Sequence, residues 1–330
     1  MPLITAKNII QKELSDPDLS VIEFHGGEPL LNFPLIRDLC EWFWQSYPEK
    51  KMGFFLTTNG TKFTEESFDW FQQHNEQITC CLSLDGNAEM NLLNRGCEIS
   101  DRVLSFMATL WPHQSVKMTI STQTLPMLAD GVIFAHEHGL QVSANLAYGI
   151  NWKESNVEVY AEQLNILIEY YLKHPSINPC KIFDASILAK VLLPYSFDRH
   201  CGAGKTFKAY DTDGKVYPCH VFAGNTMETS RWEDAEATDF KDDKQFDDPE
   251  CGECPIHNIC PTCYGMNFIE RGDVSRRDKN MCEFIKAEKL ATCMLHKQKI
   301  LSKNIDSVTE EEYLVLKAIQ HMTKFYPKIG

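Results

Sequence analysis

The sequence lacks the features that mark secreted, membrane-spanning and nucleic-acid-binding proteins. Residues 1–20 contain no apolar segment of the kind found in signal peptides, and no apolar run in the 330 residues approaches the length of a membrane span. Lys and Arg number 32 against 46 Asp and Glu, which gives a net charge of -14. Because nucleic acids and anionic membranes are bound by clustered Lys and Arg, we expect neither as a main partner. We predict a cytoplasmic protein.

Cysteine, in contrast, is abundant. The chain has 13 cysteines, an odd number that does not suit a closed disulfide framework, and in the cytoplasm they are reduced and available to metals. Seven of them lie in the quarter of the chain that ends at residue 282: Cys201, Cys219, Cys251, Cys254, Cys260, Cys263 and Cys282. Two C-x-x-C pairs within this set, at 251–254 and 260–263, have the spacing of metal ligands.

Thiolate ligands select zinc, copper(I) or iron–sulfur clusters over hard cations. A four-cysteine zinc ribbon would use the two C-x-x-C pairs, although the gap of five residues between them is shorter than in most two-knuckle zinc sites. Two iron–sulfur clusters would use all seven cysteines, four in one cluster and three in the other. Spacing alone leaves zinc and iron–sulfur open and makes disulfides the weakest of the three alternatives.

The N-terminal half alternates helical and strand patterns. The predicted helices span residues 4–14, 34–47, 64–73, 100–111 and 127–138. The predicted strands span residues 19–24, 52–58, 77–84, 115–122 and 141–147. These strands are apolar nearly throughout, which predicts a parallel sheet covered on both faces. Residues 153–173 are predicted to form a core helix, and residues 309–324 an amphipathic helix.

Polar side chains follow four of the predicted strands. They lie in the segments 25–28, 57–60, 83–86 and 121–123, at or just past the C-terminal ends of the strands. Barrel enzymes build their active sites at this end of the sheet. The pattern favours a partial or full β/α barrel over a doubly wound sheet, with a ligand site at its mouth.

Two short motifs and the cysteine pattern carry a family resemblance. The segment His25-Gly26-Gly27-Glu28-Pro29 after a strand is similar to the GGEP motif of radical S-adenosylmethionine enzymes, and Ser83-Leu84-Asp85-Gly86 resembles their SxDG segment. The seven cysteines resemble the pattern of the SPASM domain. Together these motifs cover residues from about 4 to 290. The resemblance implies an α/β fold, a partial (β/α) TIM-like barrel of the radical S-adenosylmethionine type that lacks its first strand, followed by a small cysteine-rich SPASM domain.

The resemblance also implies roles for individual residues. The residues expected to bind S-adenosylmethionine are Gly26, Gly27, Glu28, Asn59, Ser83, Asp85 and Ser121. One auxiliary [4Fe–4S] cluster is expected on Cys251, Cys254, Cys260 and Cys282, and a second on Cys201, Cys219 and Cys263. The fourth ligand of the second cluster would be His200, His220, a substrate thiolate or water. The resemblance assigns no catalytic side chain.

The chain departs from the family pattern at three places. Cys263 follows Cys260 after two residues, where the usual pattern has three, and His220 occupies a position that is acidic in sulfatase-maturing members, so we do not expect sulfatase maturation. No cysteine precedes Cys40, whereas the family holds its catalytic cluster with a C-x3-C-x2-C loop upstream of GGEP. We therefore expect the chain as written to lack the first strand and not to cleave S-adenosylmethionine reductively.

The activity that the resemblance implies is radical modification of a peptide or protein, such as a ribosomally made precursor peptide. Its cofactors would be two auxiliary [4Fe–4S] clusters and S-adenosylmethionine. The alternative is a non-catalytic iron–sulfur or zinc protein that recognises a precursor peptide. The expected domains are a partial barrel at 1–150, a helical connector at 151–195, a SPASM-like domain at 196–300 and a C-terminal helix at 301–330.

Overall fold

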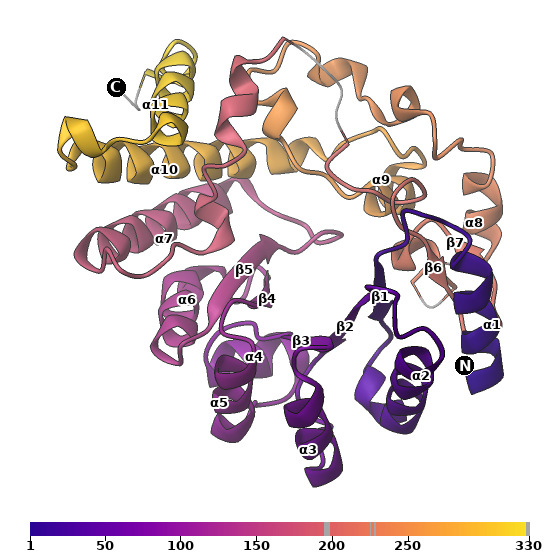
Figure 1. Cartoon of the computed structure of the whole chain (residues 1–330). Helices are drawn as coiled ribbons and strands as arrows, with labels where there is room; N and C mark the ends of the chain where they lie inside the picture. Colours follow the sequence, from indigo (N-terminus) through magenta and orange to yellow (C-terminus); the bar gives the residue numbers. More distant parts are fainter. Residues whose placement is uncertain (195–198, 225, 228, 328–330) are drawn as a thin grey trace. The chain divides into compact units, whose positions relative to one another are not determined.

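The computed structural model describes residues 1–194, 199–224, 226–227 and 229–327 (Figure 1). The chain divides into two compact units. The first unit contains Met1–Thr119, Asp130–Ser143 and Ala209–His220, and the second contains Ile120–Ala129, Ala144–Lys208 and Val221–Gly330. A late segment of the chain, Ala209–His220, therefore belongs to the same unit as the N-terminal strands.

Helices and strands alternate from the N-terminus in the predicted order. The helices are α1 (Leu3–Glu13), α2 (Phe33–Ser46), α3 (Glu65–His74), α4 (Ala88–Arg95), α5 (Asp101–Leu110) and α6 (Leu128–Glu137). The strands are β1 (Val21–Phe24), β2 (Gly53–Thr58), β3 (Ile78–Leu82), β4 (Ser115–Ile120) and β5 (Gln141–Leu146). All five predicted strands and all five predicted helices are confirmed, and α4 is an additional short helix.

The strands run parallel and in chain order. β1, β2 and β3 form one sheet, in which Phe24 lies beside Leu56 and Leu56 lies beside Cys80. A parallel bridge joins Ser83 to Lys117 in β4, and β5 is the hydrogen-bonded neighbour of β4. Leu56 and Cys80 are fully buried because their side of the sheet is covered by helices such as α2. The predicted parallel β/α architecture is confirmed.

Side-chain caps define where several of these helices begin. The Thr64 hydroxyl accepts a hydrogen bond from the Ser67 amide at the start of α3, and the Ser100 hydroxyl accepts one from the Val103 amide at the start of α5. Such caps satisfy amides that have no partner inside the helix. The helix boundaries are therefore encoded locally.

The second unit is mainly helical. Its helices are α7 (Glu154–Lys173), α8 (Thr229–Ala235), α9 (Tyr264–Arg271), α10 (Cys282–Leu301) and α11 (Glu310–Thr323). α7 is the predicted core helix, and it packs against α10, where the Tyr160 hydroxyl donates to the Glu288 carboxylate at 3.2 Å. The predicted C-terminal helix is confirmed as α11, which packs on α10 and is capped by Thr309.

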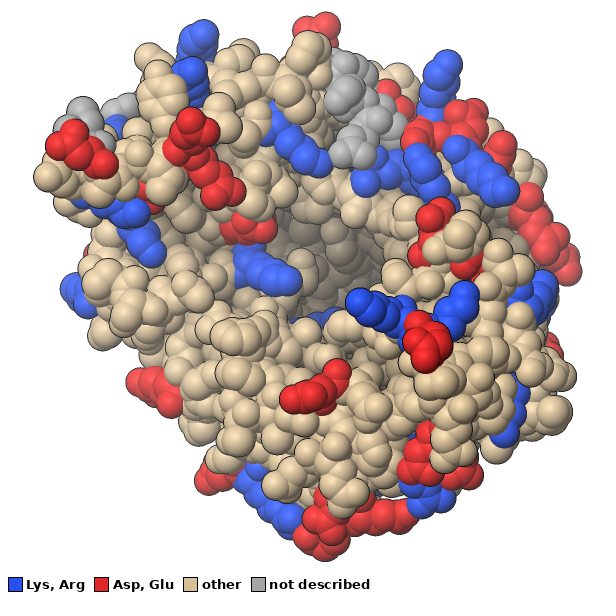
Figure 2. Space-filling model, viewed as in Figure 1, with Lys and Arg blue, Asp and Glu red and all other residues tan. Residues whose placement is uncertain are grey.

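The predicted domain boundaries at 150 and 300 stay predictions, and the boundary between residues 195 and 196 lies outside the described residues. Within the described ranges, the chain contains no helix that combines the length and the apolar character needed to span a membrane. Figure 2 shows acidic and basic side chains interspersed on the visible face.

Candidate functional site

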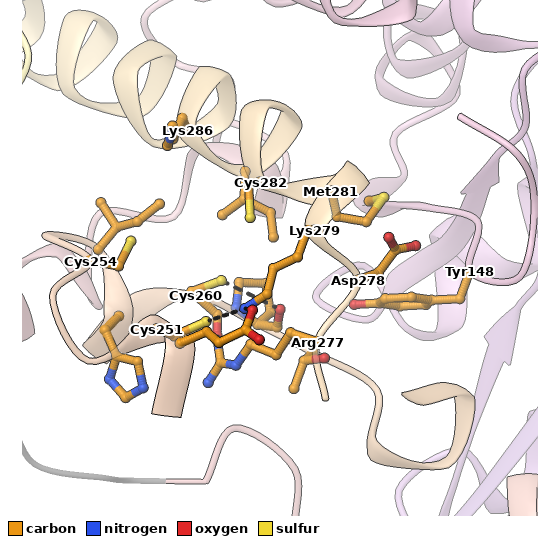
Figure 3. Close-up of a pocket in the computed structure, with 16 residues that line it drawn as sticks. Tyr148, Cys251, Cys254, Cys260, Arg277, Asp278, Lys279, Met281, Cys282 and Lys286 are labelled. Atoms are coloured by element: carbon orange, nitrogen blue, oxygen red, sulfur yellow. Dashed lines mark hydrogen bonds and ion pairs between the residues drawn. The ribbon is translucent and has the colours of Figure 1, made fainter. Parts of the chain in front are cut away.

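Four of the predicted ligand cysteines line one cavity in the second unit. Cys251, Cys254, Cys260 and Cys282 surround a space of about 260 Å³, and Figure 3 shows their thiols around the Lys279 side chain. Cys282 is the first residue of α10, and the other three lie on the loop that precedes α9. The four residues predicted to share one cluster are thus brought together.

Successive tight turns place the three loop cysteines. The Cys254 amide donates to the Cys251 carbonyl at 3.0 Å, and the Cys260 amide donates to the His257 carbonyl at 3.2 Å. Each of these i to i+3 bonds reverses the chain within four residues, so that side chains close in sequence can face a common space. The local sequence therefore contributes to the placement of the three loop cysteines.

A buried carboxylate joins this loop to the segment before α10. Asp248, 3% exposed, accepts hydrogen bonds from the Glu250 amide and the Arg277 amide, each at 3.0 Å. It also accepts one from Lys279 Nζ at 2.9 Å. Because a buried carboxylate with three donors is strongly held, Asp248 fixes the position of Cys251 relative to residues 277–279.

Two cations face the thiols. Lys279 Nζ donates to Cys251 Sγ at 3.2 Å. Arg277, 6% exposed, donates from Nη1 to the Cys260 carbonyl at 2.9 Å, and its buried Nε has no hydrogen-bond partner among the described residues. Sequence reasoning missed both residues and Asp248. Their signal was the presence of charged side chains immediately beside the cysteine motifs.

Burial opposes the ionisation of three of the four thiols. Burial raises the pKa of Cys260 to about 11 and also raises the pKa values of Cys251 and Cys282, while Lys279 and Arg277 act in the opposite direction. Metal ligation requires thiolates, so metal binding here releases protons. The two cations reduce the electrostatic cost of gathering that negative charge.

The donor set and the space fit an iron–sulfur cluster. Among the described residues, no three His, Cys, Asp or Glu side chains are grouped so as to hold one metal ion. The cavity of about 260 Å³ offers well over ten times the roughly 15 Å³ that one bound water needs. Four thiols around such a space, with an unpaired buried donor in its wall, suit a polyatomic group that carries hydrogen-bond acceptors.

The other three predicted ligands are divided between the two units. Cys201 and Cys263 belong to the second unit, where proximity to Cys201 contributes to a raised pKa of Cys263 after the larger effect of burial. Cys219 belongs to the first unit and is 5% exposed. The three-cysteine cluster and its fourth ligand, whether His200 or His220, stay predictions.

Six of the predicted S-adenosylmethionine residues lie at the ends of β1, β2 and β3. Gly26 and Gly27 directly follow β1 and are exposed. The Glu28 carboxylate accepts hydrogen bonds from the Leu30 amide at 3.0 Å, the Thr58 hydroxyl at 2.7 Å and the Asn59 amide at 2.8 Å. Glu28 therefore ties the end of β1 to the end of β2.

The remaining predicted residues of this set also make contacts within the chain. Asp85, with a side chain 2% exposed, accepts from Arg95 Nη2 at 2.8 Å and from the Thr119 amide at 2.7 Å. The Ser83 amide donates to the Thr58 carbonyl at 2.8 Å. Ser121 belongs to the second unit and lies next to Thr124. Binding of S-adenosylmethionine by these residues stays a prediction.

A polar network across the strands was not predicted. Thr57 in β2 donates to Glu23 Oε1 in β1 at 3.1 Å, and Lys117 Nζ in β4 lies 3.0 Å from Thr57 Oγ1 and 3.6 Å from Glu23 Oε1. Next to it, the rings of His25 and His220 have their centroids 4.3 Å apart. The sequence did contain a signal for this network, namely the charged residues Glu23 and Lys117 inside otherwise apolar strands. A strand that is buried on both faces does not carry such residues.

A family model described as "4Fe-4S single cluster domain" matches residues 3–99. This segment contains the GGEP-like motif and four cysteines, of which Cys40, Cys80 and Cys81 are buried in the core of the first unit. Burial raises the pKa of each of these three thiols. The match therefore covers the β/α part of the chain and not the cysteine-rich region.

A curated relative, uncharacterized protein MJ0907 of Methanocaldococcus jannaschii, is 31% identical over 86 residues. The aligned region is 26% of this chain and 29% of the relative, so the chain spans less than a third of that protein's length.

Solved structures resemble nearly the whole chain. Native anSMEcpe with bound AdoMet matches with a TM-score of 0.70 at 16% identity, over 92% of this chain and 91% of that one. The same protein with AdoMet and the Cp18Cys peptide matches with a TM-score of 0.68 at 17% identity, over 92% of both chains. Streptococcus suis SuiB bound to S-adenosylmethionine gives a TM-score of 0.56 at 16% identity, over 85% of this chain and 69% of that one. At these identities the likeness establishes the fold alone, and the chain has the α/β fold of anSMEcpe and SuiB.

Proposed function

We propose that this protein takes part in S-adenosylmethionine-dependent radical modification of a peptide or protein, with iron–sulfur clusters in its cysteine-rich region. The observation that carries the proposal is the convergence of Cys251, Cys254, Cys260 and Cys282 on one cavity. They do so in a chain whose fold matches proteins solved with AdoMet and with peptides, among them SuiB bound to precursor peptide SuiA.

The two glycines after β1 support a ligand site in the first unit. At Gly26 and at Gly27, no atom of the described residues lies within 4 Å of the position that a Cβ would occupy. Neither residue has a positive φ. Packing and backbone conformation therefore do not require glycine at either position. A bare backbone at the end of a parallel strand permits close approach of a ligand, which is the role expected for S-adenosylmethionine.

On this proposal, Glu28 positions the backbone that binds the ligand. Its carboxylate already accepts three hydrogen bonds from the ends of β1 and β2, so it holds Gly26 and Gly27 beside Asn59. An ionised carboxylate oxygen can accept more than one bond, which leaves capacity for an amino group of the ligand. A polar part of the substrate would lie against Glu23, Thr57 and Lys117. The side chains of Glu23 and Lys117 carry opposite charges and are each about half exposed, so they can contact a ligand.

The bound cofactors would supply radical chemistry at an unactivated C–H bond, with the auxiliary clusters anchoring the substrate or taking up an electron. The four thiols of the cavity would hold one cluster, and Asp248 would keep the Cys251 turn in place. Cys201, Cys219 and Cys263 would hold the second cluster.

A second candidate function is non-catalytic recognition of a precursor peptide by an iron–sulfur or zinc protein. The observation in its favour is that Cys40, Cys80 and Cys81, within the segment that matches the 4Fe-4S family model, are buried and have raised pKa values. Those thiols are therefore poor ligands for a catalytic cluster.

Anaerobic reconstitution tests the proposal. We expect about eight iron and eight sulfide per chain, as two four-iron clusters require. The paired variant Cys251→Ala/Cys254→Ala should lose about four of each, whereas the matched control Cys97→Ala, outside the cysteine-rich region, should lose none. Calorimetry with S-adenosylmethionine should detect binding that Gly27→Val abolishes. One or two zinc ions and no iron after anaerobic purification would contradict the cluster assignment.

A further inference from the structure

We propose that Lys279 and Arg277 raise the reduction potential of the cluster held by the four-cysteine cavity, and that Asp248 positions Lys279 for this role. The inference rests on the proposed function, because it requires that Cys251, Cys254, Cys260 and Cys282 hold an iron–sulfur cluster. It goes beyond that function, since it assigns a task to three residues that are not ligands.

Lys279 is held against a ligand sulfur. Its Nζ lies 3.2 Å from Cys251 Sγ and 2.9 Å from Asp248 Oδ2. A third contact, to Glu250 Oε2, is 3.5 Å long and involves a side chain that is 72% exposed. The Asp248 side chain is only 5% exposed, so the buried carboxylate rather than the surface one determines where the ammonium group lies.

Arg277 provides a second and more deeply buried charge. Its guanidinium is always protonated in proteins, and the residue lines the same cavity while only 6% exposed. Nη1 is satisfied by the Cys260 carbonyl at 2.9 Å, but Nε has no partner among the described residues. A buried donor without a partner destabilises the folded chain. A sulfide or thiolate sulfur of the bound cluster would remove that destabilisation.

Lys286 is a third cation of the cavity wall, and it lowers the pKa of Cys282 after a larger effect of Lys279. Its ammonium group is paired with Glu283 at 2.6 Å. Lys279, in contrast, donates a hydrogen bond directly to a ligand sulfur, and Arg277 is more deeply buried. We therefore assign the main positive charge at the ligands to Lys279 and Arg277.

The direction of the effect follows from charge. A one-electron reduction adds a negative charge to the cluster and breaks no bond, and in a titration the electron comes from dithionite. A nearby cation and an N–H···S hydrogen bond stabilise the reduced form more than the oxidised form, which raises the potential. Little solvent screens this interaction at Arg277 because the site is buried.

Potentiometric titration of the reconstituted full chain, followed by electron paramagnetic resonance, tests the inference. Lys279→Gln and Arg277→Gln should each move one midpoint to a more negative value, on the order of tenfold in the redox equilibrium or about 59 mV for one electron. Lys279→Arg should remain near the parent. Asp248→Asn removes a carboxylate and by itself raises the midpoint, so its positioning role is measured by the double variant: Lys279→Gln should shift the midpoint less in the Asp248→Asn background than in the parent. The matched control is Lys299→Gln, which removes a cation from α10 outside the cavity wall and should leave the midpoint unchanged.

Iron and sulfide are counted in every sample, so that this inference and the proposed function can be tested separately. Full iron content with parent-like midpoints in both glutamine variants would overturn this inference and leave the proposed function standing. If Lys279→Gln loses its iron, the midpoint of Arg277→Gln decides: a shift to a more negative value supports the inference, and a parent-like midpoint overturns it. A parent chain that takes up no iron would overturn the inference and the proposed function together.

Discussion

The imidazole rings of His25 and His220 lie with their centroids 4.3 Å apart in the first unit, although the two residues come from opposite halves of the sequence. The contact forms because the hairpin of β6 (Ala209–Tyr210) and β7 (Val216–Tyr217) packs with the N-terminal elements, where the Tyr210 hydroxyl donates to Glu13 at 2.5 Å. The residue after Cys219 is thereby placed beside the residue before Gly26. A predicted cluster ligand and the GGEP-like motif thus share one unit.

A double-mutant cycle should detect this contact. We expect His25→Ala and His220→Ala to couple by about 0.5–1 kcal/mol in the free energy of unfolding, as stacked or tilted ring pairs do. Chemical denaturation of the parent, the two single variants and the double variant measures the coupling. The same cycle with His113, which is exposed and distant in sequence, provides the control. Additive effects of His25→Ala and His220→Ala would contradict the contact.

Replacement of Glu288 should destabilise the second unit. Lys289 is 4% exposed, and its Nζ lies 2.7 Å from Glu288 Oε1, so Glu288→Gln leaves a buried ammonium without its counter-charge. We expect a loss of about 3 kcal/mol in the free energy of unfolding. The surface pair of Glu283 and Lys286 is the matched control, and Glu283→Gln should cost less than about 0.5 kcal/mol. Equal effects of the two variants would refute the burial argument.

Replacement of a motif glycine by alanine should lower stability at Gly86 and have little effect at Gly26. Gly86 has φ of 119°, and a Cβ there would collide with the Met90 side chain and lie 3.0 Å from Gly131 Cα. We expect Gly86→Ala to lose about 2–4 kcal/mol of stability. Gly26→Ala should stay within about 0.5 kcal/mol of the parent because the position is exposed and open. Thermal or chemical unfolding of both variants measures this, and a large loss for Gly26→Ala would show a packing role instead of a ligand role.

Acid should destabilise the protein in part through His296. Burial lowers its pKa below the ordinary 6.5. The hydrogen bond that Nε2 donates to the Phe183 carbonyl opposes this shift in part, and the smaller effect of Lys299 lowers the pKa further. The unfolded chain therefore binds a proton at a pH where the folded chain does not, so the free energy of unfolding falls as pH drops below 6.5. His296→Gln should flatten this dependence, and His113→Gln should leave it intact. Parallel pH profiles for the parent and His296→Gln would rule out this contribution.

Local sequence signals account for most of the secondary structure. Apolar runs of strand length predicted strands that the structure confirms, and caps such as Thr64 and Thr309 mark in the structure where helices begin. The short helix α4 was missed because it follows a loop glycine and contains as many polar as apolar residues. Its start is capped by Asn87 and its end is marked by Gly96 in the left-handed conformation, which are signals that a sequence reading can use.

The sequence by itself determined the order of the β/α units and the set of cysteines with ligand spacing, because both depend on residues close together in the chain. Only the tertiary structure decided which charges meet those cysteines. Arg277 and Lys279 reach Cys260 and Cys251 from 17 and 28 residues further along the chain. Asp248 accepts a hydrogen bond from the Arg277 amide and so holds that segment at the cysteine loop. The tertiary structure also decided that Cys219 packs with the N-terminal unit. Such pairings follow from how whole elements pack, and no local periodicity records them.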